Sequence, residues 1–251
     1  KEKLFEILNK YSFAVLRGII EKDQIKKSKI KLSEIFCSDN DAPSTGESPQ
    51  DIMGNFQKLS IGGWERFGKS RPRCMRTFYN PIWAEDIYGL REVFIKTAML
   101  RNLLYGFRKD FAIKNVEDGF WTASRIHCYP AGGGFLSSHK DNVVSTLQKQ
   151  SGIGRYFQPI IVMSKKGTSK DCDFVSGGGF FEINKERYFY EEEAELGDII
   201  IYSGKIIHGV ADIDIHKKFD STKNIGRLAG FVTLFKEFKQ TQEFQNFIKK
   251  K

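Results

Sequence analysis

From about residue 120 to residue 236 the chain is a succession of short apolar segments separated by glycine-rich turns. We predict strands over 121–129, 135–141, 155–163, 173–183, 187–191, 198–203, 206–211 and 226–235. Short apolar runs bounded by turn residues are typical of antiparallel β-structure. Eight of them predict a mainly β protein with flanking helices. Its core is expected to be a double-stranded β-helix, the jelly-roll architecture of cupin-like proteins.

The remainder of the chain is expected to support this core. Residues 1–10 and 22–35 have helical patterns with a strand at 11–18 between them, and residues 87–107 have the apolar spacing of a helix. We expect one domain over 1–251, in which 1–118 is a helical support, 119–236 is the jelly roll and 237–251 is a C-terminal helix. The polar stretch 38–60 is predicted to be a loop, and either a substrate lid or a disordered segment fits its composition.

A candidate metal site lies in the triplet His139-Lys140-Asp141 together with the later His208. Residues i and i+2 of a strand point the same way, so His139 and Asp141 can hold one ion. A neighbouring strand can add His208. Two imidazoles and one carboxylate form the facial triad of non-heme Fe(II) oxygenases. Taken alone, the triplet also fits a strand end with a solvated Asp.

Further polar candidates alternate along the predicted strands. Arg125, His127 and Tyr129 share one face of their strand, and that face either lines a cavity or faces solvent. Arg155 and Gln158 begin the strand that follows the triplet. We treat Arg125, His127, Arg155 and Gln158 as candidate substrate contacts.

These motifs resemble those of the Fe(II)/2-oxoglutarate-dependent dioxygenases, in the group of prolyl hydroxylases and phytanoyl-CoA hydroxylase. The resemblance rests on the H-x-D triplet, the distal His208 and Arg227 near the start of the last apolar strand, and it covers about residues 120–236. It implies that His139, Asp141 and His208 are the catalytic iron ligands. It also implies Fe(II), O2 and 2-oxoglutarate as cofactors, and hydroxylation of a C–H bond with formation of succinate and CO2.

The resemblance further implies that Arg227 holds the distal carboxylate of 2-oxoglutarate. A planar guanidinium suits two-pronged carboxylate binding, although a strand-end salt bridge is the alternative for Arg227. Many family members carry Ser or Thr two residues later, where this chain has Ala229. Tyr129 is therefore our candidate for the hydroxyl partner of that carboxylate.

Composition limits the substrate and the location only broadly. The net charge is +9, from 40 basic and 31 acidic residues, but the basic residues are spread without an aromatic-interleaved stripe. We therefore expect a small molecule, such as an amino acid or a natural-product intermediate, rather than nucleic acid. A nucleic-acid or protein-directed oxygenase and a non-catalytic jelly-roll binding protein remain alternatives.

The cysteines and the hydropathy pattern bear on the compartment. The four cysteines form no C-x-x-C pair, which predicts free thiols and a reducing environment. No apolar run reaches the ~20 residues that span a bilayer. We expect a cytoplasmic protein without a membrane segment, and the pattern does not predict its oligomeric state.

Overall fold

A computed structural model describes residues 2–43, 48–49, 52, 56–62, 72–141, 156–237, 246 and 249. Its helices are α1 (Glu2–Tyr11), α2 (Lys22–Ile35) and α3 (Arg91–Tyr105), with short 3-10 turns η1 (Ser38–Asn40) and η2 (Tyr190–Glu192). Its strands are β1 (Phe13–Leu16), β2 (Ala42–Pro43), β3 (Gln57–Ile61), β4 (Pro72–Tyr79), β5 (Phe120–Pro130), β6 (Phe135–His139), β7 (Phe157–Val162), β8 (Gly178–Ile183), β9 (Glu186–Phe189), β10 (Ile199–Ser203), β11 (His208–Ala211) and β12 (Gly226–Lys236).

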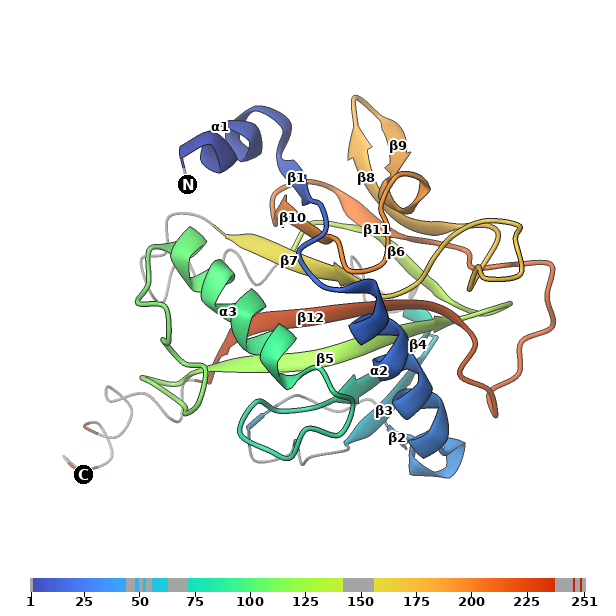
Figure 1. The fold of residues 1–251 in the computed structure, drawn as a ribbon, viewed down its shortest axis with the longest axis horizontal. Coiled ribbons are helices and arrows are strands. Elements are labelled where there is room, and N and C mark those ends of the chain that lie inside the picture. Colours follow the sequence, from blue (N-terminus) through green and yellow to red (C-terminus); the bar gives the residue numbers. More distant parts are fainter. Residues whose placement is uncertain are drawn as a thin grey trace.

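The strands form one curled sheet that folds over on itself. Its order is β1-β10-β7-β12-β5-β4-β6-β11-β8-β9, and β3 pairs with β4 on a side branch that also carries β2. Figure 1 shows the two halves of this sheet, with β6, β11, β8 and β9 above β12 and β5. Ile160 of β7 and Phe181 of β8 belong to one apolar cluster, so the halves pack face to face. The predicted jelly roll is confirmed.

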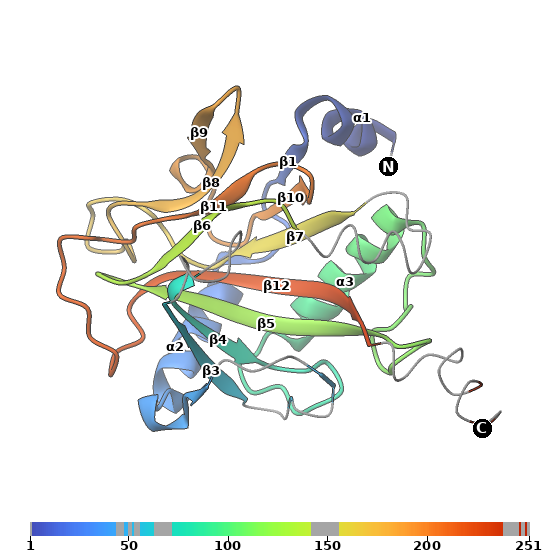
Figure 2. The same cartoon turned by 180° about the vertical axis from the view of Figure 1, so that it is seen from behind.

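Strand β5 shows how the two faces of the longer half-sheet differ. Ile126 and Cys128 are completely buried in the apolar cluster that includes α2 and α3. Arg125, His127 and Tyr129 lie on the opposite face, because successive side chains of a strand alternate. Figure 2 shows α2 and α3 behind the sheet, so the polar face of β5 is turned toward the other half-sheet.

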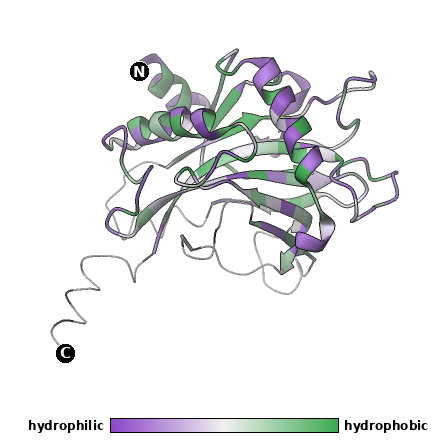
Figure 3. Ribbon diagram, turned by 60° about the horizontal axis from the view of Figure 1, so that its bottom comes forward, coloured by the Kyte–Doolittle hydropathy of each residue, from purple (hydrophilic) through white to green (hydrophobic). Residues whose placement is uncertain are grey.

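Strand β12 repeats this alternation next to β5. Leu228 and Val232 pack toward the helices, whereas Arg227 and Phe231 face the interior between the half-sheets. The two strands pair antiparallel along their whole length, with Arg227 opposite Tyr129. Figure 3, coloured by hydropathy, shows polar and apolar stretches interleaved along the strands of the sheet.

All eight strands predicted after residue 120 are present, as are the helices near residues 1–10, 22–35 and 87–107. Strands β2, β3 and β4 are absent from the prediction, and the expectation of a loop is wrong for residues 42–43 of β2 and 57–60 of β3. Most of the proposed lid and nearly all of the proposed helix over 237–251 lie outside the described residues. Among the described helices, none has both the length and the apolarity needed to cross a membrane.

Candidate active site

Two adjacent strands bring the three predicted metal ligands together. His139 ends β6, Asp141 follows it, and His208 begins β11, where it pairs directly with His139. The Nε2 atoms of His139 and His208 lie 3.7 and 3.4 Å from Oδ1 of Asp141. The ligand atoms of all three residues lie within 4.8 Å of one another. This spacing suits a single small cation at their centre.

Backbone hydrogen bonds hold both imidazoles in the tautomer that a metal needs. Nδ1 of His139 lies 2.7 Å from the carbonyl oxygen of Ser137, and Nδ1 of His208 lies 3.0 Å from that of Ile206. Each Nδ1–H donates to its carbonyl, which leaves Nε2 unprotonated. Burial, reinforced by the neighbouring His208, lowers the pKa of His139, so its imidazole is neutral and available as a ligand at neutral pH.

Tyr202 and the backbone orient the carboxylate of Asp141. The Tyr202 hydroxyl donates to Oδ2 of Asp141 over 3.1 Å, and the Asp141 N–H donates to the carbonyl oxygen of Gly204. Burial raises the pKa of Tyr202 well above its usual value, so the hydroxyl keeps its proton. Burial alone would raise the pKa of Asp141, but its polar contacts, with the Tyr202 hydroxyl among them, lower that pKa below its usual value. Asp141 is therefore an ionised ligand.

Arg227 lies in the same cavity and is paired with a buried carboxylate. Its Nε donates to Oε1 of Glu191, and its Nη2 donates to the Tyr190 hydroxyl over 2.6 Å. Its Nη1 is shielded from solvent and has no hydrogen-bond partner among the described residues. A buried guanidinium nitrogen without an acceptor is costly. An incoming carboxylate would supply the missing acceptor.

Gly179 of β8 makes this arrangement of Arg227 and Tyr190 possible. A Cβ atom at Gly179 would lie 1.9 Å from the Tyr190 hydroxyl oxygen and 2.8 Å from Nη2 of Arg227. The Gly179 N–H donates to Oε2 of Glu191 over 2.5 Å. The absence of a side chain at Gly179 therefore leaves room for the side chains that orient Arg227.

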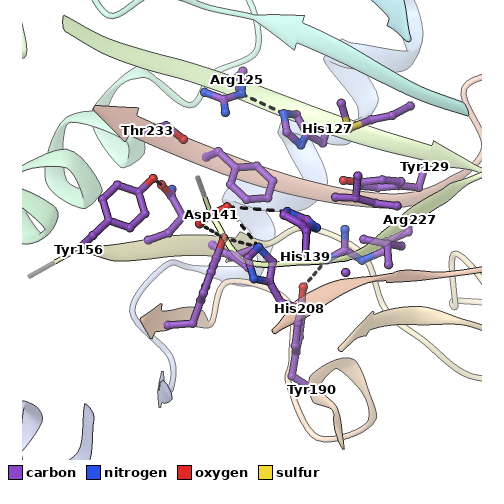
Figure 4. Close-up of a pocket in the computed structure, with 18 of the residues that line it drawn as sticks. Arg125, His127, Tyr129, His139, Asp141, Tyr156, Tyr190, His208, Arg227 and Thr233 are labelled. Atoms are coloured by element: carbon purple, nitrogen blue, oxygen red, sulfur yellow. Dashed lines mark hydrogen bonds and ion pairs between the residues drawn. The ribbon is translucent and has the colours of Figure 1, made fainter. Parts of the chain in front are cut away.

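The triad and Arg227 line one cavity of about 250 Å³ between the two half-sheets. Figure 4 shows the triad at its centre, with Arg227 and Tyr190 on one side and Arg125 and Thr233 on the other. Its walls are both polar and apolar: Met75, Arg125, His127, Tyr129, Leu136, His139, Asp141, Tyr156, Gln158, Ile160, Tyr190, Tyr202, His208, Gly209, Val210, Arg227, Phe231, Thr233 and Phe235.

The structure places the other predicted site residues as follows. Arg125, His127, Tyr129 and Gln158 all line the cavity, whereas Arg155 lies outside the described residues. Tyr129 is 1% exposed and its ring lies 5.3 Å from the guanidinium carbon of Arg227. Arg227 itself donates to the hydroxyl of Tyr190. Tyr129 therefore packs against the guanidinium, and its contact with the carboxylate of 2-oxoglutarate stays a prediction.

The residues present fit the cofactors that the sequence suggests. A cation with two neutral imidazoles and one carboxylate on one side keeps open positions toward the cavity, as non-heme Fe(II) requires. The unpartnered Nη1 of Arg227 in the same cavity fits the distal carboxylate of 2-oxoglutarate.

Several site residues were not predicted from the sequence. Glu191 and Tyr190 belong to the acidic stretch Tyr190-Glu191-Glu192-Glu193, which has the pattern of a solvated turn. Tyr202 was seen only as part of an apolar strand. It faces the cavity because it lies opposite Gln158 of β7, and the sequence pattern does not show that strand pairing.

Comparison with known proteins gives a fold likeness. No protein-family model matches the chain, and no curated protein matches its sequence. A prolyl hydroxylase from Trichoplax adhaerens, solved with a peptide fragment of the hypoxia inducible factor oxygen degradation domain, has a TM-score of 0.52 and 12% identity over 95% of this chain and 90% of that one. A Pseudomonas putida prolyl-4-hydroxylase has a TM-score of 0.48 and 12% identity over 92% of this chain and 97% of its own. The chain thus shares the fold of the Trichoplax prolyl hydroxylase.

Proposed function

We propose that this protein is an Fe(II)- and 2-oxoglutarate-dependent oxygenase that hydroxylates a C–H bond. One observation carries the proposal: three metal-ligand atoms lie within 4.8 Å of one another in a cavity that also contains the unpartnered Nη1 of Arg227. A metal site alone fits many functions. The pairing of a facial triad with a buried guanidinium nitrogen fits a co-substrate that carries a carboxylate at each end.

Each residue has a distinct task in this proposal. His139, Asp141 and His208 hold the iron, and Tyr202 fixes the carboxylate of Asp141. Arg227 binds the distal carboxylate and is oriented by its neighbours Glu191 and Tyr190. The iron, with 2-oxoglutarate and O2, supplies the oxidising chemistry. The chain's part is to position the reactants and to keep bulk water from the cavity.

A small molecule is the substrate class that we propose, because the cavity is of the size of one and its walls combine apolar surface with a few polar groups. A peptide is the second candidate, since the Trichoplax prolyl hydroxylase of the same fold was solved with one.

The four cysteines are free thiols, as is usual in a reducing compartment, which supports a cytoplasmic location.

The test is succinate formation from 2-oxoglutarate in air, with and without added Fe(II). We expect slow iron-dependent turnover without substrate, and its loss in His139→Ala. His216→Ala is the matched control, because His216 is exposed and is not among the residues that line the cavity. Absence of turnover, together with absence of Fe(II) and 2-oxoglutarate binding, would contradict the proposal and leave a jelly-roll binding protein.

A further inference from the structure

The structure buries four arginines among its described residues, and their hydrogen bonds divide them into two pairs. In Arg76 and Arg101 all three guanidinium nitrogens donate to oxygen acceptors, such as Asp41 for Arg76 and Asn102 for Arg101. These two arginines are structural. Arg227 and Arg125 differ, because each keeps one nitrogen without a described partner and each lines the cavity.

Of the two cavity arginines, Arg125 is the one whose positive charge is not balanced by a neighbouring carboxylate among the described residues. It is 7% exposed, and it has no carboxylate partner among the described residues. Its Nε donates to Nε2 of His127 over 2.9 Å and its Nη1 donates to the Ala123 carbonyl oxygen over 3.2 Å. The rings of Phe231 and Phe235 lie 5.8 and 5.2 Å from its guanidinium carbon. Aromatic faces stabilise a cation only in part, so a buried positive charge remains without a counter-ion.

His127 adds a second unused donor beside Arg125. Because its Nε2 accepts from Arg125, the proton of the neutral imidazole lies on Nδ1. That Nδ1 is shielded from solvent and has no hydrogen-bond partner among the described residues. Burial and the charge of Arg125 lower the pKa of His127 well below its usual value, so the ring is neutral. The pair therefore presents one positive charge and one neutral N–H donor.

We propose that Arg125 and His127 form a second anion subsite, which binds the carboxylate of the substrate. This inference rests on the proposed function and names its substrate class: a small carboxylic acid with an apolar portion. Figure 4 shows Arg125 and His127 above the triad and Arg227 to its right. Arg125 lies opposite Phe231, four residues along β12 from Arg227, so the two carboxylates have separate places. One charge with one added N–H matches a monoanionic carboxylate better than a dianionic phosphate. Phe231 and Phe235 fit the apolar portion of the acid.

The test compares matched ligands on the full chain under argon, with and without Fe(II) and 2-oxoglutarate. The probes are 3-phenylpropionate, its neutral isostere 3-phenylpropanamide and the dianion phenylphosphonate, and binding is measured by ligand-observed NMR. We expect the carboxylate to bind at least tenfold more tightly than the amide. We expect Arg125→Met to abolish this preference. Arg108→Met, which changes an exposed arginine, is the matched control and should preserve it.

Several results would overturn the subsite. In wild type, these are equal affinities for the carboxylate and the amide, no binding of the carboxylate, or a higher affinity for the phosphonate. In Arg125→Met, it is an undiminished preference for the carboxylate over the amide. Displacement of the probe by 2-oxoglutarate that depends on Arg227 would also overturn it. Titration of each variant with 2-oxoglutarate separates this inference from the proposed function. If wild type binds no 2-oxoglutarate but binds the carboxylate through Arg125, the subsite stands and the oxygenase proposal fails.

Discussion

The two ends of the cavity present the same side chain in opposite electrostatic settings. Arg227 is 1% exposed and paired with the buried Glu191, so its charge is balanced within the protein. Arg125 is also buried, but it has only an imidazole, a carbonyl and two aromatic rings around it. A balanced guanidinium is held rigidly and contributes to the fold. An unbalanced one is a cost to the fold that a ligand can offset, which points to ligand binding at the Arg125 end.

The largest expected difference between the ends is in stability. Arg227→Met leaves Glu191 as an unpaired buried carboxylate, which should lower the free energy of unfolding by about 3–5 kcal/mol. Arg125→Met removes a charge that has no acidic partner and should change it by less than about 1 kcal/mol. Urea unfolding followed by circular dichroism measures both. Adding Glu191→Leu to Arg227→Met should restore part of the loss, and equal destabilisation by the two single variants would refute the contrast.

The next difference is in 2-oxoglutarate affinity. Arg227→Lys keeps the charge but loses the planar fork, and a hydrogen bond to a charged group contributes about 1.5–3 kcal/mol. We expect the dissociation constant of 2-oxoglutarate to rise roughly 10- to 100-fold in calorimetric titrations with Fe(II) under argon. The matched change Arg125→Lys should leave it within about twofold of wild type. A stronger effect at Arg125 than at Arg227 would reverse the assignment of the two ends.

The Arg125 end should also have its own dependence on pH. The pKa of His127 lies well below 6.5 in the folded protein, so below pH 6.5 the unfolded chain takes up a proton that the folded one does not. His127 therefore costs stability as the pH falls below 6.5, by about 1 kcal/mol between pH 6.5 and 5.5. Unfolding of His127→Asn across this range should show a correspondingly flatter profile. The exposed His216→Asn should behave as wild type; an unchanged slope in His127→Asn would mean that His127 is protonated when folded.

The smallest expected effect concerns a single hydroxyl at each end. Tyr190→Phe removes the acceptor for Nη2 of Arg227 and should weaken 2-oxoglutarate binding by about 0.5–1.5 kcal/mol, or roughly 2- to 10-fold. Thr233→Val makes a similar change beside Arg125 and should not affect that binding. Parallel calorimetric titrations of the two variants decide the point. An equal loss in both would show that 2-oxoglutarate extends across the whole cavity.

Local patterns predicted much of the fold and part of the site. The alternation of Arg125, His127 and Tyr129 with Ile126 and Cys128 showed that the first three share a face, but only the packing of α2 and α3 decides which face is interior. The two-residue spacing of His139 and Asp141 is a property of any strand, so their convergence was predictable. The approach of His208 depends on the pairing of β11 with β6; the resemblance implied that His208 is a ligand but did not predict this pairing.

The missed features depend on long-range contacts. Strand β4 carries Arg76, whose charge argues against a buried strand until Asp41 is seen beside it. Glu191 lies in an acidic run, yet it is buried because Arg227, 36 residues later, pairs with it. No local pattern marks either pair, because each partner lies in a different part of the chain.

The central claim is that the triad and Arg227 jointly bind Fe(II) and 2-oxoglutarate, and its most direct test is an anaerobic titration followed by visible absorption. Chelation of Fe(II) by a 2-oxo acid produces a charge-transfer band without any need for substrate. We predict that this band appears in wild type and in Arg125→Met, is absent in Asp141→Ala and needs much more 2-oxoglutarate in Arg227→Lys. A wild-type protein that gives no such band with both components in excess would contradict the account.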